Sequence, residues 1–232
     1  MGNWVIAIGR IVGIGRVEGL GVRLAAGLAV LALSACTGEP ATSEVPATPA
    51  TPAAAPAVAA TTATVSGRVP VVGGGAPTVV ILKPTEAREF PAQAAKPVMD
   101  QVSLTFTPAL MFVRTGQPAE FRNSDDVLHN VRVREEATRG GTFNVALPTG
   151  GAYDHAFERD GFYDVGCDIH PGMSALVVST STPYAVIADA QGSYTVYDVA
   201  PGSYVATVYA GTQTLERKVE ITAGTFALDV AP

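Results

Sequence analysis

One seven-residue segment, Cys167-Asp-Ile-His-Pro-Gly-Met173, constrains the fold of this chain more than any other feature of its sequence. The residues before it alternate with the period of a β-strand, which places Cys167 on the same inward face as Val165. The apolar run that follows, residues 174–179, is typical of a returning buried strand. Because a loop this short joins two strands, we expect Cys167, His170 and Met173 to converge on one small volume.

A second strand pattern contributes another histidine. Residues 127–134, Val-Leu-His-Asn-Val-Arg-Val-Arg, alternate so that His129 shares one face with Val127 and Val131, whereas Asn130 lies on the other face. His129 is therefore predicted to lie on the apolar face and to point into the same core as the thiol.

Two imidazoles, one thiolate and one thioether form the donor set of a type I (blue) copper site, in which two His and one Cys lie in a plane with a weak axial Met. Zinc fits less well, because a thioether is a poor zinc ligand. A nucleophilic Cys-His pair is another alternative, but nothing in the spacing supplies a third, orienting residue. A buried structural thiol with two surface histidines is a further interpretation, and it does not explain why Pro171 and Met173 share one turn.

The small numbers of histidine and cysteine limit the chemistry further. The chain has three histidines, fewer than a multicopper oxidase needs, and the third, His155, has no partner ligand at a useful spacing. We expect His155 to be a surface residue. The two cysteines, Cys36 and Cys167, lie in segments of very different character, so a disulfide between them is not expected.

The two segments that contain these candidate ligands resemble those of a known protein family. Val127-Leu-His-Asn-Val131 and Cys167-x-x-His170-x-x-Met173 resemble the ligand segments of cupredoxins, and the short loop is most similar to that of amicyanin. The resemblance implies one copper ion per chain with His129, Cys167 and His170 as equatorial ligands and Met173 as the axial ligand. It also implies that His170 lies at the surface as the port for electrons, and that Asn130 locks the ligand strands together through hydrogen bonds.

The rest of the sequence favours an all-β fold, because short runs rich in Val and Thr are separated by turn residues, and the chain has 24 Gly and 17 Pro. We predict a Greek-key cupredoxin β-sandwich over 98–180 and a second small β-sandwich made of 64–97 and 181–232. Two phrases, Asp189-Ala-Gln-Gly-Ser-Tyr194 and Val199-Ala-Pro-Gly-Ser-Tyr204, resemble the turns of carboxypeptidase-regulatory-like or transthyretin-like sandwiches. The cupredoxin would then be inserted into this second sandwich.

The first 63 residues predict export and a membrane tether. A 12-residue apolar stretch between Arg23 and Cys36 has the length of a signal-peptide core, and Leu33-Ser-Ala-Cys36 resembles a bacterial lipobox. We assign 1–36 to this signal, with a lipid anchor on Cys36, although an ordinary cleaved signal is the alternative. The Ala/Thr/Pro-rich segment 37–63 is a linker that spans about 80 Å at about 3.1 Å per residue.

Together these features predict an exported, membrane-anchored blue-copper protein of the bacterial periplasm or cell surface that carries single electrons and is not an enzyme. The alternative is an envelope copper-binding or copper-delivery protein, which the small number of Met and His disfavours; a scaffold with a vestigial site is a third hypothesis. The net charge of −6 argues against nucleic acid and is suited to a basic redox partner, such as a cytochrome or a dehydrogenase, including an amine-oxidising one.

Overall fold

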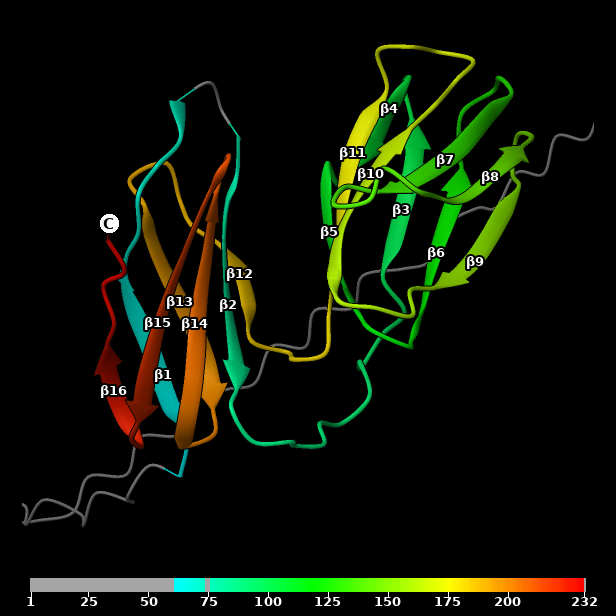
Figure 1. The fold of residues 1–232 in the computed structure, drawn as a ribbon. Coiled ribbons are helices and arrows are strands. Elements are labelled where there is room, and N and C mark those ends of the chain that lie inside the picture. Colours follow the sequence, from blue (N-terminus) through cyan, green and yellow to red (C-terminus); the bar gives the residue numbers. More distant parts are fainter. Residues whose placement is uncertain (1–60, 74–75, 232) are drawn as a thin grey trace, which may run out of the picture. The chain divides into compact units, whose positions relative to one another are not determined.

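The computed structural model describes residues 61–73 and 76–231, and the regular elements of these residues are sixteen β-strands (Figure 1). The predicted all-β class is confirmed. Within the described ranges no helix is long and apolar enough to cross a membrane. The predicted signal over 1–36, the lipid anchor on Cys36 and nearly all of the predicted linker lie outside these ranges. The first strand begins at Ala63, the residue that we assigned to the end of the linker, and this alanine is buried.

Strands β3 to β11 make two sheets, with the strand orders β5-β11-β10-β7-β8 and β4-β3-β6-β9. The nine strands are β3 Val98–Val102, β4 Thr105–Thr107, β5 Leu110–Arg114, β6 Pro118–Asn123, β7 His129–Glu135, β8 Gly141–Leu147, β9 Ala152–Ala156, β10 Gly161–Gly166 and β11 Ser174–Thr180. Most neighbouring strands are antiparallel, but β11 pairs with β5, and β3 with β6, in parallel. This mixed pairing of two sheets is consistent with the predicted all-β cupredoxin sandwich.

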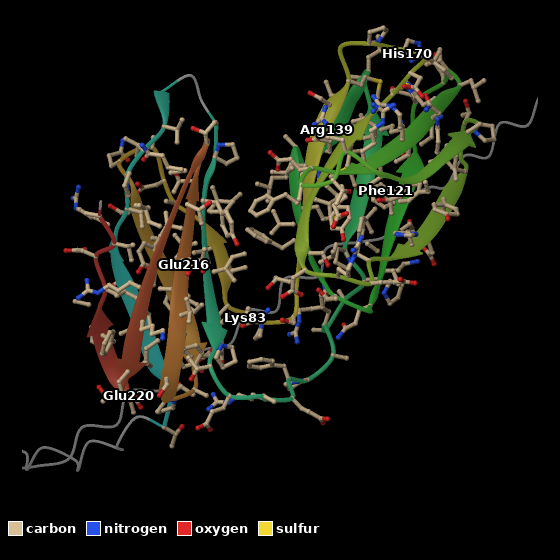
Figure 2. All side chains as sticks on the ribbon, in the orientation of Figure 1. Lys83, Phe121, Arg139, His170, Glu216 and Glu220 are labelled. Carbon is tan, nitrogen blue, oxygen red and sulfur yellow. The ribbon has the colours of Figure 1, made fainter. Side chains whose placement is uncertain are left out.

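The core of this sandwich consists of inward-facing side chains from both sheets. Phe121, which Figure 2 labels, is fully buried, as is Phe157. The rings of these two residues lie 6.5 Å apart, and the ring of Tyr163 lies 4.6 Å from that of Phe157. Each large apolar side chain contributes about 1.5–3 kcal/mol when it is fully buried. Cys167 and Met173 belong to the same cluster, so the predicted ligand loop begins and ends in the core.

The remaining strands make two further sheets, with the orders β13-β1-β16 and β12-β2-β14-β15. The strands are β1 Ala63–Arg68, β2 Thr78–Pro84, β12 Ala185–Ile187, β13 Ser193–Val199, β14 Gly202–Ala210, β15 Gln213–Ile221 and β16 Gly224–Ala227. Strands from before residue 85 thus pair with strands from after residue 184. The domain boundaries and the transthyretin-like character of these sheets remain predictions.

Aromatic side chains and one glycine fix the packing of these outer sheets. Tyr204 is fully buried, and its hydroxyl donates to the carbonyl of Ala200 at 2.7 Å. Tyr194 donates to the carbonyl of Leu228 at 2.6 Å, and burial raises the pKa of Tyr194 to about 12. A Cβ atom at Gly67 would lie 1.9 Å from the same Leu228 carbonyl oxygen, so only glycine fits where β1 passes residue 228.

Candidate metal centre

Strand register brings the predicted ligands to one end of the five-stranded sheet. Strand β10 is antiparallel to β7 and to β11, and Gly166 at its end pairs with Arg132 and with Ser174. The start of β7, which is His129, therefore lies beside the loop that joins β10 to β11. That loop is the segment from Cys167 to Met173 (Figure 1).

The donor atoms of His129, Cys167 and His170 lie within 4.8 Å of one another. The Cys167 Sγ atom is 3.8 Å from the Nδ1 atom of each histidine, and the two Nδ1 atoms are 2.9 Å apart. Atoms that bind one metal ion at about 2.0–2.3 Å are separated by distances of this size. Two imidazole nitrogens and a thiolate are also the equatorial donors of a type I copper site, so these three residues fit copper.

A carboxylate determines which nitrogen of His129 faces the site. The Nε2 atom of His129 lies 2.9 Å from Oδ2 of Asp125, and the imidazole is fully buried. A carboxylate only accepts hydrogen bonds, so Nε2 carries the proton. The neutral imidazole then has its lone pair on Nδ1, which is the atom that faces Cys167 and His170.

Asp125 is itself held by a turn that lies about twenty residues earlier in the chain. The amides of Ser103 and Leu104, in the turn between β3 and β4, donate to Oδ1 and Oδ2 of Asp125 at 2.5 and 2.9 Å. The bond from the Leu104 amide, with smaller contributions from His129 and from the Ser103 amide, lowers the pKa of Asp125. The carboxylate is therefore ionised at neutral pH.

Asn130 connects the two ligand segments. Its Oδ1 atom accepts hydrogen bonds from the amides of Asp168 and Ile169 at 2.7 and 3.3 Å and lies 3.3 Å from Sγ of Cys167. Its side-chain nitrogen donates to Asn144 and to Asp168. Asn130 thus forms the hydrogen bonds between ligand segments that the family resemblance implies. The strand alternation placed it on an outward face, but it is buried, because the ligand loop covers that end of β7.

A charged group reinforces this connection from outside. Arg132 Nε donates to Oδ1 of Asp168 at 2.6 Å, and Asn144 donates to Oδ2 of the same carboxylate at 3.0 Å. The bond from Arg132 is the main reason that the pKa of Asp168 is lowered. Arg132 also lies against the backbone of Gly166, where its guanidinium nitrogen is 2.7 Å from the position a Cβ would take. A side chain at 166 would displace the arginine.

Met173 closes the loop at its far end. Its amide donates to the carbonyl of His170 at 3.0 Å, and its carbonyl accepts from the amide of Cys167 at 3.3 Å. The side chain is buried in the core cluster that also contains Cys167. The bond from Cys167 keeps the first and last residues of the loop next to each other, and the bond to His170 closes the turn between them.

His170 differs from His129 in its exposure. It is half-buried and lies at the end of the sheet, beyond the strands, where Figure 2 labels it. Its sequence neighbours Ile169 and Pro171 are both exposed, Ile169 by 46%, and Leu128, which precedes the other histidine, His129, is 52% exposed. Exposed apolar residues therefore precede both histidines of the metal centre in the sequence.

Two positions differ from the sequence-based expectations. Val127 does not share the inner face with His129, because β7 begins only at His129 and Val127 is 40% exposed in the preceding loop. His155 is not a plain surface residue: its ring packs between those of Phe143 and Phe157, with centroids 4.6 and 4.8 Å away. Burial among these rings lowers the pKa of His155.

Asp125 was not among the residues predicted from the sequence. A signal was present, since an aspartate four residues before a predicted ligand lies in a turn rich in Asn and Asp, and such side chains reach neighbouring polar groups. Nothing in the sequence, however, connected this turn to Ser103 and Leu104. Asn123 supports the same loop by donating to the carbonyls of Val127 and Leu147, both at 2.8 Å.

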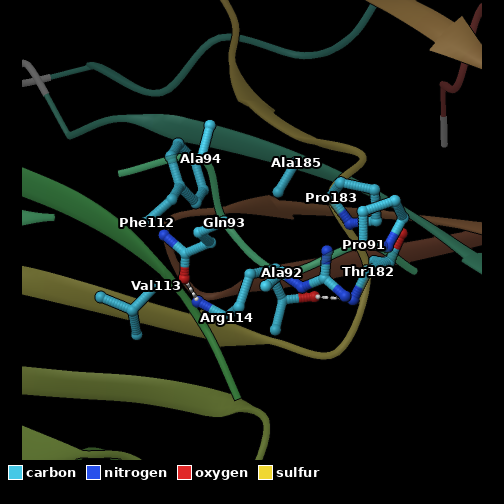
Figure 3. A pocket seen from close by; sticks show the side chains of 11 residues that line it. Pro91, Ala92, Gln93, Ala94, Phe112, Val113, Arg114, Thr182, Pro183 and Ala185 are labelled. Carbon is cyan, nitrogen blue, oxygen red and sulfur yellow. Dashed lines mark hydrogen bonds between the residues drawn. The ribbon is translucent and has the colours of Figure 1, made fainter. Parts of the chain in front are cut away.

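Among the pockets in the described residues, one of about 380 Å³ lies apart from the metal centre (Figure 3). None of His129, Cys167 and His170 lines it. Its walls come from residues 91–94, from β5 and from the segment that follows β11, and the amide of Arg114 donates to the Gln93 side chain there. The pocket lies between chain segments and contains none of the three metal-binding donors, which lie instead at the end of the five-stranded sheet.

Fold and donor set together define a copper-binding β-sandwich. Residues 93–180 match the family model of copper binding proteins of the plastocyanin/azurin family. The predicted likeness to cupredoxins is thus confirmed for this part of the chain. The cofactor of the family is copper, which the His-Cys-His donor set fits.

Several solved structures resemble this chain. The purple cupredoxin from Nitrosopumilus maritimus is 23% identical, with a TM-score of 0.33, over 36% of this chain and 99% of that one. A mutant amicyanin in its reduced state is 22% identical, with a TM-score of 0.34, over 38% of this chain and 85% of that one. The copper-containing nitrite reductase of Thermus scotoductus SA-01 is 21% identical, with a TM-score of 0.34, over 42% and 25% of the two chains. A comparison with curated proteins gave no match.

Proposed function

We propose that this protein carries single electrons through one type I copper ion held by His129, Cys167, His170 and Met173. The observation that carries the proposal is the convergence of two imidazole nitrogens and one thiol within 4.8 Å at the end of a cupredoxin sheet. Met173 completes the donor set as the weak axial ligand, because it is buried beside Cys167 at the close of the loop. When bound, copper supplies a one-electron redox couple.

The protein's own contribution is a site whose ligands keep their places in both redox states. Asp125 holds the imidazole of His129, and Asn130 holds the loop that begins at Cys167. Groups fixed in this way by surrounding hydrogen bonds lose little freedom on binding metal and move little when its charge changes. A site of this kind suits an electron carrier better than a carrier that must release its metal.

Electrons enter and leave through His170. It is the more exposed of the two imidazoles, and the exposed apolar side chains of Leu128 and Ile169, which precede His129 and His170 in the sequence, supply the apolar rim of this port. A small apolar contact area is typical of the short-lived complexes that redox proteins form. The acidic net charge favours a basic partner, such as a cytochrome or a dehydrogenase, including an amine-oxidising one.

We further propose that the protein is exported to the bacterial periplasm or cell surface and anchored by a lipid on Cys36. The lipobox-like Leu33-Ser-Ala-Cys36 supports the anchor, and the Pro-rich segment 37–63 supports a tether between membrane and copper domain. Metabolic labelling with a fatty acid tests the anchor: label is expected in the wild type and absent after Cys36→Ala, and equal labelling of both would overturn it.

Electron carriage is tested by a potentiometric titration of the copper-loaded protein with redox mediators. We expect one reversible one-electron transition with the metal retained in both states, and no such transition in Cys167→Ser. A protein that binds Cu(I) tightly but loses the metal on oxidation would contradict electron carriage. That outcome would favour copper capture or delivery instead.

A further inference from the structure

Three donors converge on the carboxylate of Asp125 and occupy most of its hydrogen-bonding capacity. They are the amide of Ser103 on Oδ1, and the amide of Leu104 and the Nε2 atom of His129 on Oδ2. The Asp125 side chain is only 13% exposed, and that of His129 is not exposed at all. A single carboxylate therefore joins a turn of the opposite sheet to a metal-binding imidazole, largely shielded from water.

The turn that holds Asp125 contains residues that rarely adopt its backbone conformation. Ser103 and Leu104 occupy the two central positions between β3 and β4, with φ angles of 52° and 57°. Two successive residues in this left-handed region form the hairpin turn for which Asn-Gly is preferred, and larger side chains there are strained. Such strain persists where surrounding contacts compensate it, and here the Asp125 carboxylate accepts both amides of the turn.

The charge of Asp125 acts differently on the two redox states. The oxidised metal centre carries one more positive charge than the reduced centre. A fixed negative charge one imidazole away attracts the oxidised form more strongly, and it is screened little where water is excluded. The carboxylate should therefore favour the oxidised state.

We propose that Asp125 is a positioning residue of the metal centre, through which the β3–β4 turn fixes the tautomer and orientation of His129 and lowers the reduction potential of the copper. This inference rests on the proposed function, because it concerns the same copper site. It adds a role for a carboxylate and for a turn that supply no ligand themselves.

The first test compares two substitutions that remove the same formal charge. Asp125→Asn removes the charge but keeps an oxygen that can accept from His129. Asp126→Asn is the matched control, because Asp126 is the next residue, is exposed, and makes no side-chain hydrogen bond within the described residues. We expect the reduction potential of the copper-loaded full chain to rise in Asp125→Asn and to change much less in Asp126→Asn.

The second test separates the positioning of His129 from the support of the turn. Asp125→Ala should lower copper affinity by about 10–100-fold, the usual effect of removing such a partner. The triple variant that adds Ser103→Asn and Leu104→Gly relieves the turn of its strain. We expect this variant to recover the thermal stability lost in Asp125→Ala without recovering copper affinity.

The outcomes distinguish this inference from the proposed function. Equal potentials in the wild type and Asp125→Asn, or full recovery of copper affinity in the triple variant, would show that Asp125 only supports the turn and would overturn the inference alone. A wild type that binds copper without a reversible redox couple would overturn electron carriage. In that case the copper affinities of Asp125→Ala and of the triple variant would still decide whether Asp125 positions His129. A wild type that binds no copper would overturn both.

Discussion

The side-chain oxygen of Asn130 accepts a hydrogen bond from the backbone amide of Asp168 at 2.7 Å. Asn130 follows His129 directly and Asp168 follows Cys167 directly, so this one contact joins the two chain segments that supply the histidine and the thiol. The distance between the two donors therefore depends on an amide side chain that binds no metal.

Replacing Asn130 should weaken the site before metal is added. Asn130→Ala leaves the amide of Asp168 without its partner in a partly buried position, which costs about 1–3 kcal/mol of stability. Denaturant unfolding of the metal-free protein measures this loss. Asn144→Ala is a suitable control because Asn144 contacts the same network from an exposed position, and it should cost clearly less. Equal losses in the two variants would argue against the role of Asn130.

Met173 should tune the copper rather than hold it. In Met173→Leu the thioether is replaced by an apolar side chain of similar volume, which a core tolerates well. We expect the thiolate-to-copper absorption to remain, because the equatorial donors are unchanged, and the reduction potential to shift. Redox titration measures the shift. An unchanged potential would exclude Met173 as an axial ligand.

The apolar rim of Leu128 and Ile169 should control the rate of electron exchange. Leu128→Lys places a charge on a side chain that is 52% exposed, so folding and copper binding should be unaffected. Two such molecules would then repel each other, and the electron self-exchange rate, measured by NMR line broadening, should fall. The reduction potential should stay the same. A normal exchange rate in this variant would place the electron port elsewhere.

His155 should make the protein less stable in mild acid. Burial lowers its pKa in the folded state below the ordinary value of 6.5, so the unfolded chain binds its proton more readily. Stability from this group is present above pH 6.5 and is lost as the pH falls from 6.5 through the lowered folded pKa. Unfolding curves between pH 7.5 and 5 should show this loss in the wild type and a smaller one in His155→Gln. An equal pH dependence would assign the effect to other groups.

Much of the fold and the convergence of the donors was predictable because both depend on local patterns. The alternation in 127–134 and 161–167 and the short loop after Cys167 are sufficient to bring His129, Cys167 and His170 to one end of a sheet. The family motifs then indicated copper. Each of these signals lies within about seven consecutive residues.

Other features depend on contacts between distant residues and were not predictable. The partner of Asp125 is a turn about twenty residues away, and the burial of Asn130 depends on where the ligand loop folds over β7. Alternation also failed at Val127, because a period of two shows which residues share a face but not where the strand begins. His155 was misjudged because its ring packs against Phe143, which comes from another strand, β8.

The most direct test of the account is the visible absorption spectrum of the protein loaded with Cu(II), recorded beside Cys167→Ser. An intense thiolate-to-copper band in the wild type, absent from the serine variant, is the predicted result. A colourless wild type, or a band that persists without the Cys167 thiol, would contradict the assignment of His129, Cys167 and His170 as a type I copper site.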